Sequence, residues 1–195
     1  MITVGIDGPV LAGKSTLCNA LVSRLSERGL DVEVIDCYVD FTQARGGLVP
    51  PPIAENAAAQ LATVDAFLEI ERARIASQRG AAITIFDRTP LSLAAHASGV
   101  AAMGGADVRE EAQARISSRL PLDLNFYLRV THASQLVRKV TRKNLPDVFV
   151  DPQFSAGFGK YFERLVESNS LLAIDAELST EHNVSIMLDQ IVRLS

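Results

Sequence analysis

Short apolar runs alternate with longer amphipathic segments along the chain. The short runs predict β-strands at 2–7, 31–35, 81–86, 124–130 and 171–174. The longer segments predict α-helices at 14–28, 54–79, 110–119, 133–143, 154–168 and 181–194, with a further helix after Pro90 and a glycine- and alanine-rich loop at 99–108. Because strands and helices alternate, we expect an α/β fold, a three-layer sandwich in which helices flank a five-stranded parallel sheet.

The length and charge of the chain narrow its class. It has 195 residues without an internal repeat or long linker, so we expect residues 1–195 to form one domain. Its formal net charge of −4 argues against a dedicated nucleic-acid binder. The N-terminus does not resemble a signal peptide, and the apolar stretches are too short to span a membrane. We therefore expect a cytoplasmic protein without nucleic-acid or membrane partners, in which Cys18 and Cys37 pack as buried thiols.

Residues 8–15, GPVLAGKS, match the phosphate-binding pattern G-x-x-x-x-G-K-[ST], with a predicted strand before them and a predicted helix after them. In this motif, called the phosphate loop below, backbone N–H groups surround phosphates, Lys14 faces the β- and γ-phosphates, and Ser15 binds Mg²⁺. We expect ATP or a close relative, bound with Mg²⁺ by Gly8, Val10, Leu11, Ala12, Gly13, Lys14, Ser15 and Thr16. The motif alone does not separate a kinase from a GTPase or an ATPase motor.

Two further predicted strands end in charged residues, Asp36 and the pair Asp87-Arg88. Ligands of parallel sheets bind beyond the carboxyl ends of strands, where a carboxylate can hold a magnesium-bound water or accept a hydroxyl proton. An adjacent arginine can bind an acceptor phosphate. Alternatively, Asp87 is a loop or helix-cap residue and Arg88 forms a surface ion pair. Asp40 could share or take over the role of Asp36, and Phe41 could stack on a base or simply pack.

The predicted helix at 133–143 is basic. Arg138 and Arg142 are four residues apart and share a face, while Lys139 and Lys143 add charge. The following segment, NLPDVFVDPQ, is long enough to act with the end of this helix as a lid at about 138–153. Guanidinium groups stabilise charge during phosphoryl transfer, so we expect Arg138 or Arg142 to be catalytic. A solvated helix face is the alternative.

Several segments occur in the order found in the thymidylate kinases and, more widely, in the nucleoside and nucleoside-monophosphate kinases. ITIFDR resembles the strand of that family that ends in Asp-Arg, TQARGG its T-x-x-x-G-G segment, and FLEIER the helix with an acidic-Arg pair near the acceptor. PLDLNFYLRV and IDA are similar to its later strands. The resemblance implies that Lys14 and Ser15 serve ATP and magnesium, that Asp87 acts near the metal and the acceptor, and that Arg72 and Arg88 contact an acceptor nucleotide.

The acceptor has three interpretations. The first is the phosphate of a nucleoside monophosphate, with a pyrimidine base favoured. The second is a hydroxyl of a nucleoside or other small molecule with Asp36 as base, because IDCYVDF resembles the uridine-kinase pattern. The third is a regulatory ATPase without an acceptor. For a small-molecule acceptor we expect contacts from Asp36, Phe41, Arg45, Arg72 and Arg88. The alanine-rich helix from Ala54 could form a homodimer surface or pack on the sheet.

Overall fold

The computed structural model describes residues 1–117, 122–142 and 145–194. Within these ranges five strands form one parallel sheet in the order β2-β3-β1-β4-β5. The strands are β1 (Ile2–Asp7), β2 (Val32–Ile35), β3 (Ile83–Asp87), β4 (Leu124–Arg129) and β5 (Leu172–Asp175). The predicted α/β class and five-stranded parallel sheet are confirmed.

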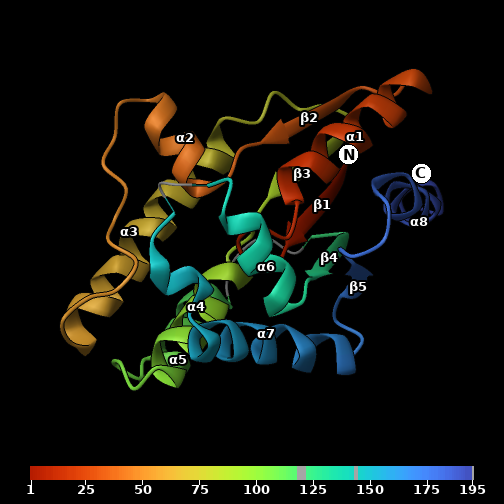
Figure 1. The fold of residues 1–195 in the computed structure, drawn as a ribbon. Helices are drawn as coiled ribbons and strands as arrows, with labels where there is room; N and C mark the ends of the chain where they lie inside the picture. The colour runs from red at the N-terminus through yellow and green to blue at the C-terminus, as the bar shows by residue number, and fades with distance from the viewer. Residues whose placement is uncertain (118–121, 143–144, 195) are drawn as a thin grey trace.

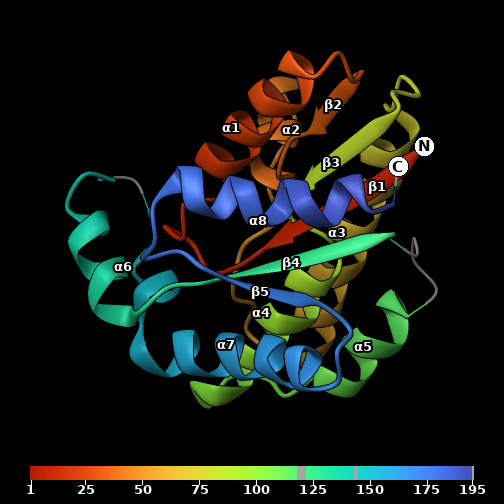
Figure 2. The same ribbon diagram turned by 90° about the vertical axis from the view of Figure 1, so that its right-hand side faces the viewer.

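Helices cover both faces of the sheet (Figures 1 and 2). On one face, α1 (Lys14–Glu27) and α8 (Thr180–Val192) pack together over a core that includes Ile6, Leu21 and Met187. On the other lie α3 (Ala57–Ala76), α4 (Leu91–Ala102) and α7 (Pro152–Glu167), with α5 (Arg109–Ile116) against α3 and α4. The remaining elements are α2 (Tyr38–Ala44), α6 (His132–Lys139) and the 3₁₀ turn η1 (Asp147–Val150). None of the helices within the described ranges is long and apolar enough to cross a membrane.

Several element boundaries differ from the sequence-based expectation. The long helix begins at Ala57 rather than residue 54, because the Asn56 side chain accepts a hydrogen bond from Ala59 N and caps it. The expected loop at 99–108 begins later, since α4 continues to Ala102. The basic helix ends at Lys139, and α2 was not expected at all. Arg119, Pro121 and Lys143 lie outside the described residues.

Glycines allow α4 and α7 to approach closely. A Cβ on Gly157 would lie 2.5 Å from the Ser98 carbonyl oxygen and 2.6 Å from the Ala102 Cβ, and a Cβ on Gly99 would lie 2.7 Å from the Phe154 ring. The tight α4–α7 contact places the apolar side chains of α7 close to the carboxyl edge of the sheet. It also explains why Gly99 is helical, because glycine here serves helix packing rather than a turn.

We expect Gly157→Ala to destabilise the fold, because the new methyl group would collide with the α4 backbone. Overpacking of this kind lowers the free energy of unfolding by about 1–3 kcal/mol. In a protein of this size, each kcal/mol lowers Tm by about 2–4 °C. Thermal and denaturant unfolding measure the change, with Lys160→Ala on the exposed side of α7 as the control. Equal stability of the two variants would contradict the packing argument.

Candidate active site

The phosphate loop connects β1 to α1 in conformations that favour glycine. Gly8 has φ 151°, and a Cβ there would lie 2.8 Å from the Leu128 carbonyl oxygen. Gly13, with φ 91°, precedes the first residue of α1. Among the described residues no side chain caps this end of α1, so its first N–H groups are available to an anion.

Lys14 lies buried across the phosphate loop. Its Nζ donates to the Pro9 carbonyl oxygen at 2.7 Å. Burial, reinforced by the positive charge of Arg88, lowers the pKa of Lys14 to about 7. The charges of Asp87 and Asp7 only partly oppose this, and a bound phosphate would add further negative charge that favours the protonated lysine.

Ser15 and Asp87 join the phosphate loop to the end of β3. The Ser15 hydroxyl donates to Asp87 Oδ2 at 2.7 Å, while Asp87 Oδ1 is buried without a hydrogen-bond partner among the described residues. A buried carboxylate oxygen without a partner beside a hydroxyl fits the oxygen-rich shell of Mg²⁺. Among the described residues no group of three or more His, Cys, Asp or Glu could hold a metal, so phosphate and water oxygens would have to complete the shell.

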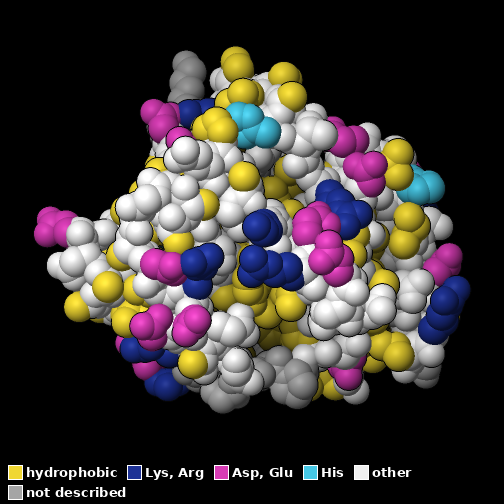
Figure 3. Space-filling view, turned by 90° about the horizontal axis from the view of Figure 1, so that it is seen from below, with side chains coloured by type: hydrophobic (Ala, Val, Ile, Leu, Met, Phe, Trp, Pro, Cys, Tyr) yellow, Lys and Arg dark blue, Asp and Glu magenta, His cyan; other side chains and the backbone are white. Residues whose placement is uncertain are grey.

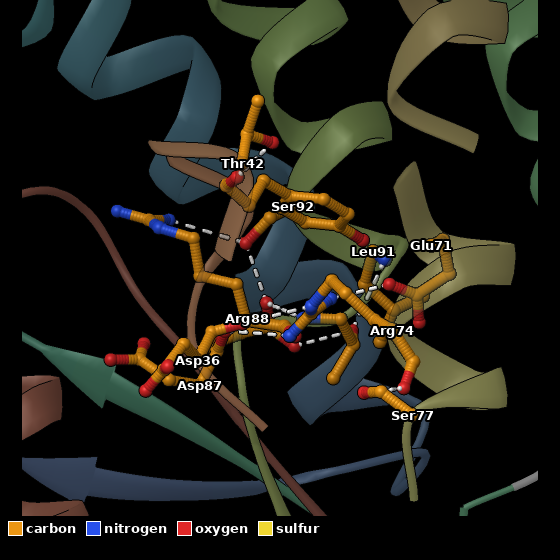
Figure 4. Close-up of polar contacts among 12 residues, drawn as sticks. Asp36, Thr42, Glu71, Arg74, Ser77, Asp87, Arg88, Leu91 and Ser92 are labelled. Atoms are coloured by element: carbon orange, nitrogen blue, oxygen red, sulfur yellow. Dashed lines mark hydrogen bonds and ion pairs between the residues drawn. The ribbon is translucent and has the colours of Figure 1, made fainter. Parts of the chain in front are cut away.

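Asp36 directly follows β2, the strand beside β3, which ends at Asp87. Ile35 pairs with Phe86, so the two aspartates follow paired residues of β2 and β3, and their carboxylates extend beyond the strand ends (Figure 4). Asp36 is exposed and lines a smaller cavity of 380 Å³ with Phe41 and Arg45.

Asp40 instead lines the main cavity, where it accepts a hydrogen bond from Cys37 Sγ at 3.3 Å. Cys37 is half-buried, so the prediction that it is buried is wrong, whereas Cys18 is buried as predicted.

Arg88 connects β3 to the phosphate loop. Its φ is 69°, and its Nη1 donates to the Gly8 carbonyl oxygen at 3.0 Å and to Ser92 Oγ at 3.3 Å. Ser92 in turn donates to Asp7 Oδ1 at 2.5 Å, and Thr89 donates to the same carboxylate through its backbone N and its hydroxyl. Burial raises the pKa of Asp7, and these hydrogen bonds oppose the rise. Sequence reasoning treated Asp7 only as the end of a strand and missed this network.

The start of the predicted lid is docked on the phosphate loop. Arg138 donates to the carbonyl oxygens of Leu11 at 2.9 Å and Ala176 at 3.1 Å, and Gln135 donates to Val10 O at 3.0 Å. Arg138 and the exposed Arg142 both line the main cavity. Lys139 forms an ion pair with Asp147 and so connects the end of α6 to η1.

The main cavity has a volume of 660 Å³ and extends from the phosphate loop to the helices on one face of the sheet. Beyond Asp87 and Arg88 its wall is mostly apolar and aromatic, formed by Val64, Phe67, Leu93, Phe149, Phe154 and Phe158. Among the buried polar atoms of this wall, Gln60 Nε2 and His96 Nε2 have no hydrogen-bond partner in the described part of the chain. In a space-filling view, hydrophobic side chains line a hollow with basic side chains beside it (Figure 3).

Four of the five predicted acceptor contacts, Asp36, Phe41, Arg45 and Arg72, are not in the lining of the main cavity. Arg72 is exposed on α3 and pairs with Glu69. Phe41 is buried, and the Arg45 guanidinium lies 3.6 Å from the centre of its ring. The structure thus brings Lys14, Ser15, Asp87, Arg88, Arg138 and Arg142 to one cavity, and it places Asp36, Phe41 and Arg45 at the neighbouring one.

A fold and site of this kind define a P-loop phosphotransferase, and the comparisons agree. The thymidylate kinase family model matches residues 5–186, so the chain belongs to the thymidylate kinase family. It is therefore a nucleotide or nucleoside phosphotransferase, and the family implies ATP as phosphate donor. A search of curated proteins finds no significant match.

Among solved structures, the chain is similar to deoxyadenosine kinase from M. mycoides. The structure with the products dCMP and a flexible dCDP has a TM-score of 0.66 at 18% identity, with 100% of both chains covered. The structure with dATP has a TM-score of 0.63 at 15% identity, covering 97% of this chain and 99% of that one. The structure with dCTP has a TM-score of 0.64 at 16% identity, covering 98% and 100%. At these identities the likeness shows the shared fold.

His96 predicts a pH dependence of stability. Its ring packs edge-on against those of Phe149 and Phe154, and burial, with a smaller effect of the Arg88 charge, lowers its pKa to about 4. Because the folded state disfavours imidazolium, this contribution to stability is full above the unfolded pKa of about 6.5 and is lost as the pH falls through 4. Between pH 7 and pH 4, wild type should lose about 3 kcal/mol more unfolding free energy than His96→Gln. Denaturant unfolding at several pH values measures this, and parallel curves would contradict it.

Proposed function

We propose that the protein is an ATP-dependent kinase that transfers the γ-phosphoryl group to a hydroxyl of a nucleoside. The observation that carries the proposal is the composition of the main cavity. Cationic and anionic side chains gather at the phosphate loop and the end of β3, whereas most of the remaining wall is apolar and aromatic. Such a wall suits the base of a neutral nucleoside, with its reacting hydroxyl at the charged end.

On the donor side, the N–H groups of the phosphate loop and the Lys14 ammonium would bind the ATP phosphates. Ser15 and Asp87 would hold Mg²⁺, which would supply positive charge for the phosphate oxygens. Arg138 is already bonded to two backbone carbonyl oxygens, so of the two lid arginines Arg142 is the better candidate for contact with the transferring group. The proposed magnesium site and the proposed role of Arg142 both rest on the position of Ser15, Asp87 and Arg142 around one cavity.

On the acceptor side, the aromatic wall would stack against the base, and Gln60 and His96 would form its polar contacts. A buried polar atom without a partner is costly, and a ligand that supplies the partner removes that cost. His96 is neutral at physiological pH because burial lowers its pKa to about 4, so it would recognise a neutral group of the acceptor.

A hydroxyl acceptor needs a general base, and we assign this role to Asp36. It follows β2 directly, beside Asp87, and its carboxylate is exposed. In the free protein Asp36 lines the neighbouring cavity, so its side chain would have to turn past the end of β3 to reach the acceptor hydroxyl. Asp40, which lines the main cavity one turn further on, is the competing candidate. Arg45 and Arg72, two of the three arginines expected to contact the acceptor, also lie away from the main cavity.

A pyrimidine nucleoside monophosphate is the second candidate acceptor. Arg88 favours it, because its guanidinium lies between the phosphate loop and the main cavity, where it could bind an acceptor phosphate. For this reaction, however, Arg88 would have to act with Arg142 or exchange its bonds to Gly8 O and Ser92 Oγ. The nucleoside therefore fits the observed contacts with less rearrangement.

An ADP-release assay across nucleosides and nucleoside monophosphates distinguishes the two acceptors. We expect turnover of at least one nucleoside, and Asp36→Asn should lower kcat by about 100-fold, since loss of a general base typically costs this much. The affinity for ATP should change little, because the phosphate loop is intact.

Asp40→Asn is the matched control and should change kcat only a few-fold. Loss of turnover in Asp40→Asn alone would move the base to Asp40. Turnover of monophosphates alone would favour the second candidate, and ATP hydrolysis that no acceptor stimulates would instead indicate a regulatory ATPase.

A further inference from the structure

A buried arginine beside the site, which the sequence analysis did not identify as a candidate, forms hydrogen bonds to several backbone groups of the site. Arg74, on α3, is fully buried and forms an ion pair with the buried Glu71 one turn earlier. Its guanidinium lies 4.3 Å from the centre of the Tyr38 ring and 5.7 Å from that of Phe86. A charge this deep is costly unless its donors are satisfied, so the partners of its remaining N–H groups indicate what it does there.

Those partners are three backbone carbonyl oxygens at the ends of two neighbouring strands. Arg74 Nε donates to Asp36 O at 2.9 Å, and Nη2 donates to Asp87 O at 3.0 Å and to Arg88 O at 2.9 Å (Figure 4). The three residues whose carbonyl oxygens it binds are the candidate base, the candidate metal ligand and the arginine beside the phosphate loop. One planar guanidinium thus joins the ends of β2 and β3.

The contact with Arg88 also supports an unfavourable backbone conformation. Arg88 has φ 69°, a left-handed conformation that costs a non-glycine residue about 1 kcal/mol or more. Its N–H donates to Ile6 O at 3.0 Å and its carbonyl oxygen accepts from Arg74, so the residue is held on both sides. This conformation lets the Arg88 side chain turn back to Gly8 O.

The same helix also forms part of the acceptor wall. Gln60, Thr63, Val64 and Phe67 of α3 line the main cavity. Arg74 therefore connects the element that would contact the acceptor to the strand ends that would carry out the chemistry.

We propose that Arg74 is a positioning residue for phosphoryl transfer, which holds Asp36, Asp87 and Arg88 in one arrangement through their backbone carbonyl oxygens. The inference rests on the proposed kinase function and on the roles proposed for these three residues. It differs from a purely structural role, in which the Arg74–Glu71 ion pair would stabilise the fold without affecting turnover.

Arg74→Lys tests the proposal, because lysine keeps the charge but replaces the planar fork with a single ammonium that cannot reach all three carbonyl oxygens in the same geometry. We expect kcat to fall by about 100-fold, the loss that a misplacement of about 1 Å produces, while the equilibrium affinity for ATP stays within threefold. Arg24→Lys, in an exposed pair with Glu27 on α1, is the matched control and should keep wild-type kcat. All rates are measured at temperatures where each variant is folded by circular dichroism.

A double-mutant cycle separates positioning from general damage. If Arg74 acts through Asp36, the Arg74→Lys change should cost much less in kcat on the Asp36→Asn background than in wild type. Equal costs on both backgrounds would overturn the proposal, as would a kcat for folded Arg74→Lys within threefold of wild type. Failure of the kinase function itself would be recognised separately, because wild type would then show no acceptor-dependent turnover.

A second variant keeps the proposal testable if the Arg74→Lys protein does not fold. The double substitution Glu71→Gln, Arg74→Gln leaves no unpaired buried charge but removes the three-carbonyl contact, and it should show the same selective loss of kcat. Wild-type kcat in this variant would overturn the proposal. If neither variant folds, Arg74 is a folding determinant and the positioning role is overturned.

Discussion

The contact between the end of β1 and the end of β3 is the interaction on which the site depends. The two strands pair from Ile2 with Ile83 to Ile6 with Asp87, so both strands end side by side at the same edge of the sheet. The buried carboxylate of Asp7 then binds the next turn through Thr89 and Ser92. As a result, the phosphate loop and the Asp87-Arg88 segment share one set of hydrogen bonds.

This arrangement buries charge next to a phosphate-binding loop. Lys14 and Asp7 are both held where burial disfavours their charged forms, which lowers the pKa of the lysine and raises that of the aspartate. Arg88 adds a second cation whose repulsion also acts on Lys14. A polyanionic ligand would relieve this repulsion, so the same contacts that are unfavourable in the free protein would favour ATP when it binds.

Much of the donor side could be predicted from sequence, because it depends on local pattern. The phosphate loop follows from the spacing of Gly8, Gly13 and Lys14, and the strand-end carboxylates follow from short apolar runs that end in Asp. The acceptor side depends on tertiary contacts that no local pattern shows. On α3, Glu69, Glu71, Arg72 and Arg74 all resemble surface residues, yet Arg74 is buried and Arg72 is exposed. His96 likewise lines the cavity beside Phe149 and Phe154, which come from η1 and α7, and no local pattern shows these contacts.

In the proposed kinase, donor and acceptor would bind in one continuous cavity, with the reacting groups between the phosphate loop and the end of β3. The most direct test is the affinity of a bisubstrate analogue in which adenosine is joined through a chain of phosphates to the nucleoside that turns over best. We expect it to displace both ATP and the nucleoside and to bind at least about 100-fold more tightly than either alone, because linkage makes the second contact intramolecular. An analogue that displaces ATP but leaves the nucleoside bound, with no gain in affinity, would rule out a shared cavity.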